Sequence, residues 1–206
     1  CVGFQISPKG QYRVLFECVP GRMNAREFAK KVRLKILEVA PEIPLADVHY
    51  CDPAGTKGAD RENGDLAWNE TVMLELGIVL MGTETNEIDP RLTAVSDELT
   101  YMIEPGVPGI VISKKHCPML RKGFASHYRY KKERIGTGER TSDKPEKNDE
   151  SNPHDALQYG LLGNKGRYGA IQGPRDASAK GRAIGHMRDR TGSAAECTVL
   201  KAPVEV

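Results

Sequence analysis

The chain has 206 residues, of which 39% are apolar and 28% charged, with a formal net charge of +2. These values are typical of a soluble globular protein with one main core, and the length is short for two full domains. A membrane span needs about 18 consecutive apolar residues. No window of the sequence approaches that length, which argues against a membrane protein.

The five cysteines are an odd number, widely spaced, and form no C-x-x-C pair. This pattern favours reduced thiols in an intracellular protein over a zinc site or a disulfide framework. No secretion signal begins at Cys1, so we expect a cytoplasmic location and a chain that comes from the interior of a longer protein.

The first elements predicted are a hairpin and a helix. Residues 2–7 and 11–19 are two β-rich runs separated by Pro-Lys-Gly, which is typical of a β-hairpin. Asn24 is a candidate N-cap with Glu27 three residues later, and apolar residues follow at helical spacing until Pro41.

Strands and helices then alternate along the chain, which predicts the α/β class: a mixed sheet flanked by helices. From Gly163 onward the composition shifts to glycine and scattered basic residues, so we expect a flexible tail over 164–206 after a domain over 1–163. The expected elements are strands at 46–51, 78–82, 109–113 and 127–132, helices at 69–77, 90–103, from 117 and at 151–162, and a polar loop at 135–150.

Positive charge is concentrated in residues 114–134, which hold eight Lys or Arg against one acid, Glu133, interleaved with aromatic residues. Cations that displace condensed counterions and aromatic rings that stack on bases are what a nucleic-acid backbone requires. An edge strand protected from aggregation by lysines would look similar. The candidate DNA-binding residues are Lys114, Lys115, Arg121, Lys122, Arg129, Lys131 and Lys132.

Asp52 follows directly after a predicted strand, in the sequence HYCDPAG. Ligands of α/β sheets gather at the carboxyl ends of strands, so this acid is a candidate metal ligand. The alternative is structural, because Asp-Pro-x-Gly is also a very good type I turn.

Asp155 stands at the beginning of the last predicted helix. If Asn152 is the N-cap and Pro153 the first helical residue, Asp155 would satisfy free backbone amides and complement the helix dipole. Taken together with Asp52, however, it makes a pair of carboxylates of the kind that hard divalent cations prefer.

Two metal ions about 4 Å apart activate a water and stabilise the leaving oxygen in phosphodiester hydrolysis. Such a site generally needs three or more carboxylates, so Asp52 and Asp155 alone do not complete it. His154 would relay a proton or touch a phosphate, or else is simply exposed at the helix start. Lys147 is either a phosphate contact or loop charge.

Four segments in this order resemble one protein family: CDPAG after a strand, NEIDPRLTAVSDEL, GIVISKKHCPMLRKGFASHYRYKK and KNDESNPHDALQYGLLG. The chain resembles the C-terminal nuclease domain of the large terminase subunit of tailed phages, over residues 1–163. The closing Asp-Ala-Leu-Gln-Tyr run is the more specific part, and the middle segments support the resemblance by their order.

The resemblance implies an RNase H-like fold and a metal-dependent endonuclease that cuts concatemeric double-stranded DNA during packaging. It implies that Asp52 and Asp155 are the second and third acids of a site for two Mg²⁺ or Mn²⁺ ions. The family's first strand, with its acid, would precede Cys1, so we expect a fragment that cuts poorly or not at all.

Further expectations come from the same resemblance. The partners would be double-stranded DNA, the small terminase subunit and the portal protein, in the host cytoplasm if the protein is viral. ATP would serve only an upstream motor domain, since no phosphate-loop motif occurs here. Asn152 stands where many relatives have His. The alternatives are an inactive prophage remnant that only binds DNA or packaging partners and, more weakly, another RNase H-like enzyme such as a resolvase or transposase.

Overall fold

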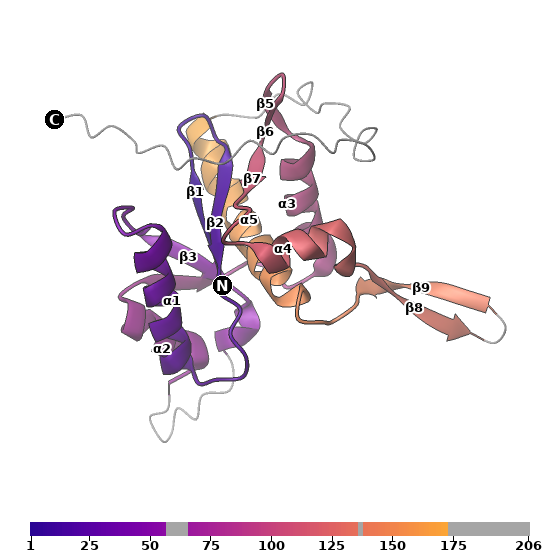
Figure 1. Cartoon of the computed structure of the whole chain (residues 1–206), viewed down its shortest axis with the longest axis horizontal. Helices are drawn as coiled ribbons and strands as arrows, with labels where there is room; N and C mark the ends of the chain where they lie inside the picture. Colours follow the sequence, from indigo (N-terminus) through magenta and orange to yellow (C-terminus); the bar gives the residue numbers. More distant parts are fainter. Residues whose placement is uncertain (57–65, 136–137, 173–206) are drawn as a thin grey trace.

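A computed structural model describes residues 1–56, 66–135 and 138–172 of the chain (Figure 1). In this part of the chain, β1 (Val2–Ile6) and β2 (Tyr12–Glu17) form an antiparallel hairpin, and β7 (Ile110–Ile112) lies parallel to β2. The expected hairpin is therefore confirmed. It belongs to a sheet of order β1-β2-β7.

The predicted N-cap of the first helix is also confirmed. The side chain of Asn24 accepts a hydrogen bond of 2.9 Å from the backbone amide of Glu27, and α1 (Ala25–Val39) ends shortly before Pro41. Helix α2 (Trp68–Leu76) lies beside α1, where the rings of Phe28 and Trp68 are 4.9 Å apart (Figure 1).

Asp52 follows the first strand of a second, parallel pair, β3 (Val48–Cys51) and β4 (Val79–Gly82), which is separate from the first sheet. Pro53 approaches β4 closely, because a Cβ on Gly82 would lie 3.1 Å from the Pro53 Cα. This packing holds the Asp52 segment against the end of β4.

The core joins the first sheet to helices α3 (Ile88–Thr100), α4 (Pro118–Lys122) and α5 (Ser151–Gln172). Burial of apolar area is the main favourable term in folding. The buried members of this core are Tyr12, Val14, Ala94, Val95, Ile110, Cys117, Leu120, Leu157 and Leu161.

Helix α5 contacts both sheets through glycines. A Cβ on Gly160 would lie 2.6 Å from the ring of Phe4 on β1, and one on Gly163 would lie 2.2 Å from the ring of Tyr50 on β3. Only glycine permits such an approach, so these two positions let α5 pack closely against both sheets.

The expected end of the last helix was wrong. The helix does not end at 162 but continues to Gln172, and Lys165 forms an ion pair of 2.5 Å with Asp97 on α3. This ion pair could not be predicted from the local composition, because its two residues are 68 positions apart. Residues 173–206 of the expected tail lie outside the described residues.

The polar loop expected over 135–150 was also wrong in part, since β9 (Gly138–Pro145) pairs antiparallel with β8 (Tyr130–Ile135). This hairpin projects away from the body of the protein (Figure 1). A second short hairpin, β5 (Met102–Glu104) and β6 (Val107–Pro108), follows α3, which ends three residues earlier than expected.

The α/β class is confirmed, but one continuous sheet is not what the structure contains. The strands of the described residues form four separate sheets, with the orders β1-β2-β7, β3-β4, β5-β6 and β8-β9. Within those residues, no helix combines the length and the apolar composition required to cross a membrane.

Candidate functional site

Asp52 adopts the turn that its sequence predicts. Its carboxylate oxygen Oδ1 accepts a hydrogen bond of 2.8 Å from the amide of Ala54, and its backbone carbonyl accepts one of 3.0 Å from Gly55. The segment Pro53–Thr56 continues as a short 3₁₀ helix. The turn leaves the Asp52 side chain at the carboxyl end of β3, so a structural role and a role in a site are compatible here.

Asp155 is not the helix-start residue that the sequence suggests. Helix α5 begins at Ser151, whose amide donates to the side chain of Asn148 at 2.9 Å, so Asn152 is not the N-cap. Asp155 falls one turn further into the helix, beyond the free amides of the first turn. Its carboxylate instead binds two cationic side chains.

The first cation is Arg91 on α3, whose Nη2 donates to Oδ1 of Asp155 at 2.5 Å. The second is Lys147, in the segment between β9 and α5, whose Nζ donates to the other carboxylate oxygen, Oδ2. The two cations differ greatly in exposure: the side chain of Arg91 is 7% exposed, and that of Lys147 is 73% exposed.

Arg91 is held from two further sides. Its Nη1 donates to Oδ1 of Asn86 at 3.3 Å, and its Cζ lies 4.2 Å from the centre of the Tyr159 ring. A guanidinium over a phenol face is attracted by the ring quadrupole. Arg91 is thus a buried, oriented cation between α3 and α5.

Sequence reasoning missed Arg91, Asn86 and Tyr159, although one signal was present. Arg91 occupies the same helical face as the buried residues Ala94 and Val95, at the i, i+3, i+4 spacing of an apolar stripe. A charged residue in an apolar stripe needs a buried partner, because an unpaired buried charge is very costly. The partner, Asp155, cannot be identified from the local pattern.

Tyr159 connects the two acids. It is 4% exposed, and its hydroxyl donates to Oδ1 of Asn86. Burial raises the pKa of the Tyr159 phenol, and the charges of Asp52 and Asp155 raise it further, against the opposing charge of Arg91. Both acids therefore lie within electrostatic range of one phenol.

The oxygen donors suit a hard divalent cation in type but are few. Within the described residues no group of three or more His, Cys, Asp or Glu side chains is placed to hold a metal ion. Both oxygens of Asp155 already bind cations. The positive charges of Arg91 and Lys147 oppose the binding of a divalent cation at Asp155.

His154 points into the protein core. It is 2% exposed, so the alternative that it is simply exposed was wrong. Its Nε2 donates to the carbonyl of Leu120 at 3.1 Å, and its ring stacks on Tyr128 with centroids 4.5 Å apart. Burial lowers the pKa of the His154 imidazole, which favours the neutral form. These contacts indicate a structural role.

The candidate DNA-binding residues lie in the turn between β7 and α4 (Lys114, Lys115), on α4 (Arg121, Lys122), just before β8 (Arg129) and on β8 (Lys131, Lys132), and all seven are exposed. Acids from distant segments neutralise part of their charge: Lys122 pairs with Glu150 at 2.5 Å and Arg129 with Glu146 at 3.4 Å. The surface is therefore less positive than the local sequence suggests.

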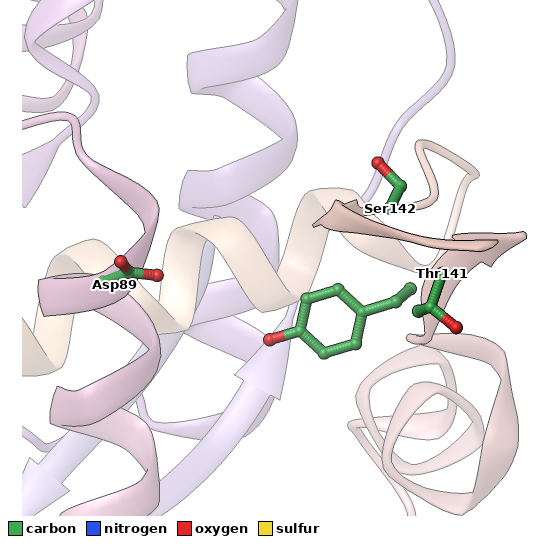
Figure 2. A pocket seen from close by; sticks show the side chains of 4 residues that line it. Asp89, Thr141 and Ser142 are labelled. Atoms are coloured by element: carbon green, nitrogen blue, oxygen red, sulfur yellow. The ribbon is translucent and has the colours of Figure 1, made fainter. Parts of the chain in front are cut away.

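An open pocket of about 450 Å³ lies between α3 and the β8–β9 hairpin (Figure 2). It is lined by Asp89, Tyr130, Thr141 and Ser142. Its described lining contains a single carboxylate and no cation, so these four residues do not supply the donors for a metal pair or a phosphate.

The chain was compared with protein-family models, with curated proteins and with solved structures, and none of the three comparisons found a match. Any assignment of function therefore depends on the residues and the geometry described above.

Proposed function

We propose that this chain is part of the RNase H-like nuclease domain of a large terminase subunit, a metal-dependent endonuclease that cuts concatemeric double-stranded DNA during packaging. One observation carries the proposal: Asp155 on α5 pairs with Arg91, which lies over the ring of Tyr159, and Asp52 after β3, far away in sequence, lies near enough to that phenol to influence its charge. Acids at a strand end and on a C-terminal helix are what the resemblance to terminases implies.

The packing of α5 supports an RNase H-like arrangement. Helix α5 contacts β1 at Phe4 and β3 at Tyr50, while among the described strands β1 pairs only with β2 and β3 pairs only with β4. A further strand between β1 and β3 would join the two sheets and would carry the first acid of the site. Edge strands carry unpaired backbone N–H and C=O groups, with which a further strand can form hydrogen bonds.

In this proposal Asp52 and Asp155 hold Mg²⁺ or Mn²⁺, both of which accept carboxylate oxygens. The bound metal would supply activation of water and stabilisation of the leaving oxygen. The exposed basic residues of α4 and β8 would hold the DNA backbone without reading its sequence. The small terminase subunit and the portal protein are the proposed partners, and ATP belongs to an upstream motor domain.

One observation favours a second candidate, a catalytically inactive prophage remnant that only binds DNA or packaging partners. Asp155 already has its charge compensated by Arg91 and Lys147, so the cluster is stable without a metal ion. The two candidates differ in whether a divalent cation binds at Asp155.

The experiment is a titration of the isotope-labelled chain with Mn²⁺, whose unpaired electrons broaden the NMR signals of nearby amides. We expect broadening centred on residues 51–54 and 154–159, and its loss in Asp155→Asn. The control variant is Asp97→Asn, since Asp97 also pairs with a lysine, Lys165, which lies ten residues beyond Asp155 on α5. In this control the broadening should persist.

Two results would count against the nuclease proposal. Broadening that is centred elsewhere, or that is unchanged in Asp155→Asn, would show that no metal ion binds at Asp155. DNA binding without any Mn²⁺ effect at Asp155 would favour the inactive remnant. A plasmid cleavage assay with Mn²⁺ completes the test, because any cleavage by this chain should disappear in Asp155→Asn.

A further inference from the structure

Cys1 and Cys18 lie directly opposite each other at the open end of the β1–β2 hairpin. The backbone nitrogen of Cys1 donates to the carbonyl of Cys18 at 2.9 Å, and the amide of Cys18 donates back to the carbonyl of Cys1 at 2.9 Å. The pair continues the antiparallel register in which Val2 faces Glu17. The two cysteines therefore form a hydrogen-bonded cross-strand pair.

This register brings the two cysteine side chains to one face of the hairpin, at a separation that suits a disulfide. Residues that exchange two backbone hydrogen bonds have Cα atoms about 5.5 Å apart, within the range of about 4.4 to 6.8 Å that disulfides span. Directly opposite Cβ atoms are about 4.5 to 5.5 Å apart, whereas the mean in disulfides is about 3.8 Å. A bond here requires a small movement of the strands, and a strained disulfide is easily reduced.

A small reagent can reach both thiols. Cys1 and Cys18 are free and only partly buried. Both line a pocket of about 250 Å³, together with apolar side chains from the segment after β2, from α1 and from α2. Burial raises the pKa of the Cys18 thiol, and the charges of Lys31 and Lys35 oppose this rise. The pair thus differs from Cys117, which is fully buried.

We propose that Cys1 and Cys18 are a redox-sensitive pair, which a low-molecular-weight disulfide such as glutathione disulfide converts to a reversible cross-strand disulfide. Disulfides in cytosolic proteins are usually transient and serve catalysis or redox sensing. This inference does not depend on the proposed nuclease function, because neither cysteine belongs to the cluster around Asp155.

The reaction consists of two thiol–disulfide exchanges. One cysteine thiolate attacks a sulfur of glutathione disulfide, which breaks its S–S bond, forms a mixed disulfide and releases one glutathione thiolate. The other cysteine thiolate attacks the protein sulfur of the mixed disulfide, forms the Cys1–Cys18 bond and releases the second glutathione thiolate. The two released thiolates take up the two protons that the cysteines lose. The cysteines are oxidised, and glutathione disulfide is reduced to two molecules of glutathione.

The bond closes the hairpin next to its contact with α4. Glu17, the neighbour of Cys18, accepts hydrogen bonds of 2.6 Å from the amide of Met119 and 2.8 Å from that of Leu120. A cross-link between residues 1 and 18 restricts the unfolded chain and so favours the folded state. We expect oxidation to raise the midpoint of thermal unfolding by about 2 to 8 °C.

The test is peptide mapping of the full chain after the reduced protein has been incubated with glutathione disulfide and the remaining thiols have been blocked. Trypsin cleaves after Lys9 and Arg13, so residues 1–9 and 14–22 are separate peptides unless a disulfide joins them. We expect the joined peptides, and their separation when an excess of reduced glutathione is added first. Cys51→Ser removes another partly buried thiol and should leave this product unchanged.

A shift of the thiol by one residue provides the matched control. In the double variant Cys1→Ser, Val2→Cys, the new thiol lies on the opposite face of β1, because successive side chains of a strand alternate between its faces. The reaction of this variant should stop at the mixed disulfide with glutathione, without a bond to Cys18.

Three results would overturn the proposal. Mixed disulfides at Cys1 and Cys18 of the unmodified chain, without the joined peptides, would exclude the cross-strand bond. Equal formation of a bond to Cys18 in the shifted variant would mean that mobility, and not the register, brings the thiols together. A Cys1–Cys18 bond that an excess of reduced glutathione does not open would exclude a reversible, redox-sensitive pair.

Discussion

The guanidinium of Arg91 and the carboxylate of Asp155 form a largely buried ion pair with an N–O distance of 2.5 Å, which joins α3 to α5. Neither residue is paired with a neighbour in its own helix. The pair therefore depends entirely on how the two helices pack.

We predict that Arg91→Met lowers the free energy of unfolding by about 3 kcal/mol, because it leaves the charge of Asp155 without its buried partner. Lys147→Met should lower it by less than about 1 kcal/mol, since that pair is exposed. Urea unfolding monitored by circular dichroism measures both changes. Equal effects of the two substitutions would contradict the difference in burial.

The close contacts of Gly160 and Gly163 predict that a larger side chain at either position weakens the packing of α5. Gly163→Ala should lower the free energy of unfolding by about 1 to 3 kcal/mol, because the new Cβ would lie 2.2 Å from the ring of Tyr50 and force a shift. The matched control is Gly21→Ala, whose Cβ would meet nothing within 4 Å. Thermal unfolding of both variants is the measurement, and a loss in the control as large as that in Gly163→Ala would refute the interpretation.

His154 provides a prediction for the core. Its ring contacts Phe124 and Tyr128 and its Nε2 donates to the carbonyl of Leu120, so His154→Ala should lose about 3 kcal/mol of stability through a cavity and the loss of a buried hydrogen bond. The exposed His127→Ala serves as the control and should change stability by less than about 0.5 kcal/mol. Chemical unfolding compares the two. If His154→Ala were as stable as the His127→Ala control, the structural role assigned to His154 would be wrong.

Cys117 should resist alkylation in the folded protein. Its side chain is 0% exposed, and burial raises the pKa of its thiol to about 12, so the reactive thiolate is scarce at pH 8. Cys1 and Cys18 are only partly buried and should react with iodoacetamide first. Mass spectrometry of the labelled peptides, with and without urea, gives the order. Labelling of Cys117 at the same rate as Cys18 in native buffer would exclude this packing.

The Lys122–Glu150 pair predicts a pH dependence of stability. The hydrogen bond from Lys122 lowers the pKa of the Glu150 carboxyl below its ordinary value of 4.5. The unfolded chain then binds the proton more readily, so the contribution of the pair is present above pH 4.5 and is lost as the pH falls through the lowered pKa.

Urea unfolding of the unmodified chain and of Lys122→Met at pH 7 and at pH 3 measures this effect. The difference in stability between the two proteins should shrink at the lower pH. Lys114→Met is the control for the removal of an exposed charge. A difference that grows on acidification would reverse the sign of the interpretation.

Local sequence patterns predicted the features whose interacting residues are close together in the sequence. The β1–β2 hairpin follows from two β-rich runs around a turn, and the start of α1 follows from the Asn24 side chain and the Glu27 amide only three residues away. The turn at Asp52 has the same local origin. In each case the partners are fixed by the covalent chain, so the sequence alone determines the contact.

Only the tertiary structure determined the features whose interacting residues are far apart in the sequence. Asp155 has the position of a helix-start acid in the sequence, yet it binds Arg91 from α3, because a buried carboxylate is stabilised by whichever cation the packing brings to it. The close contacts of Gly160 with Phe4 and of Gly163 with Tyr50 also join residues that are far apart in the sequence. Burial depends on the whole fold, so composition and periodicity cannot assign the residues that surround the two acids.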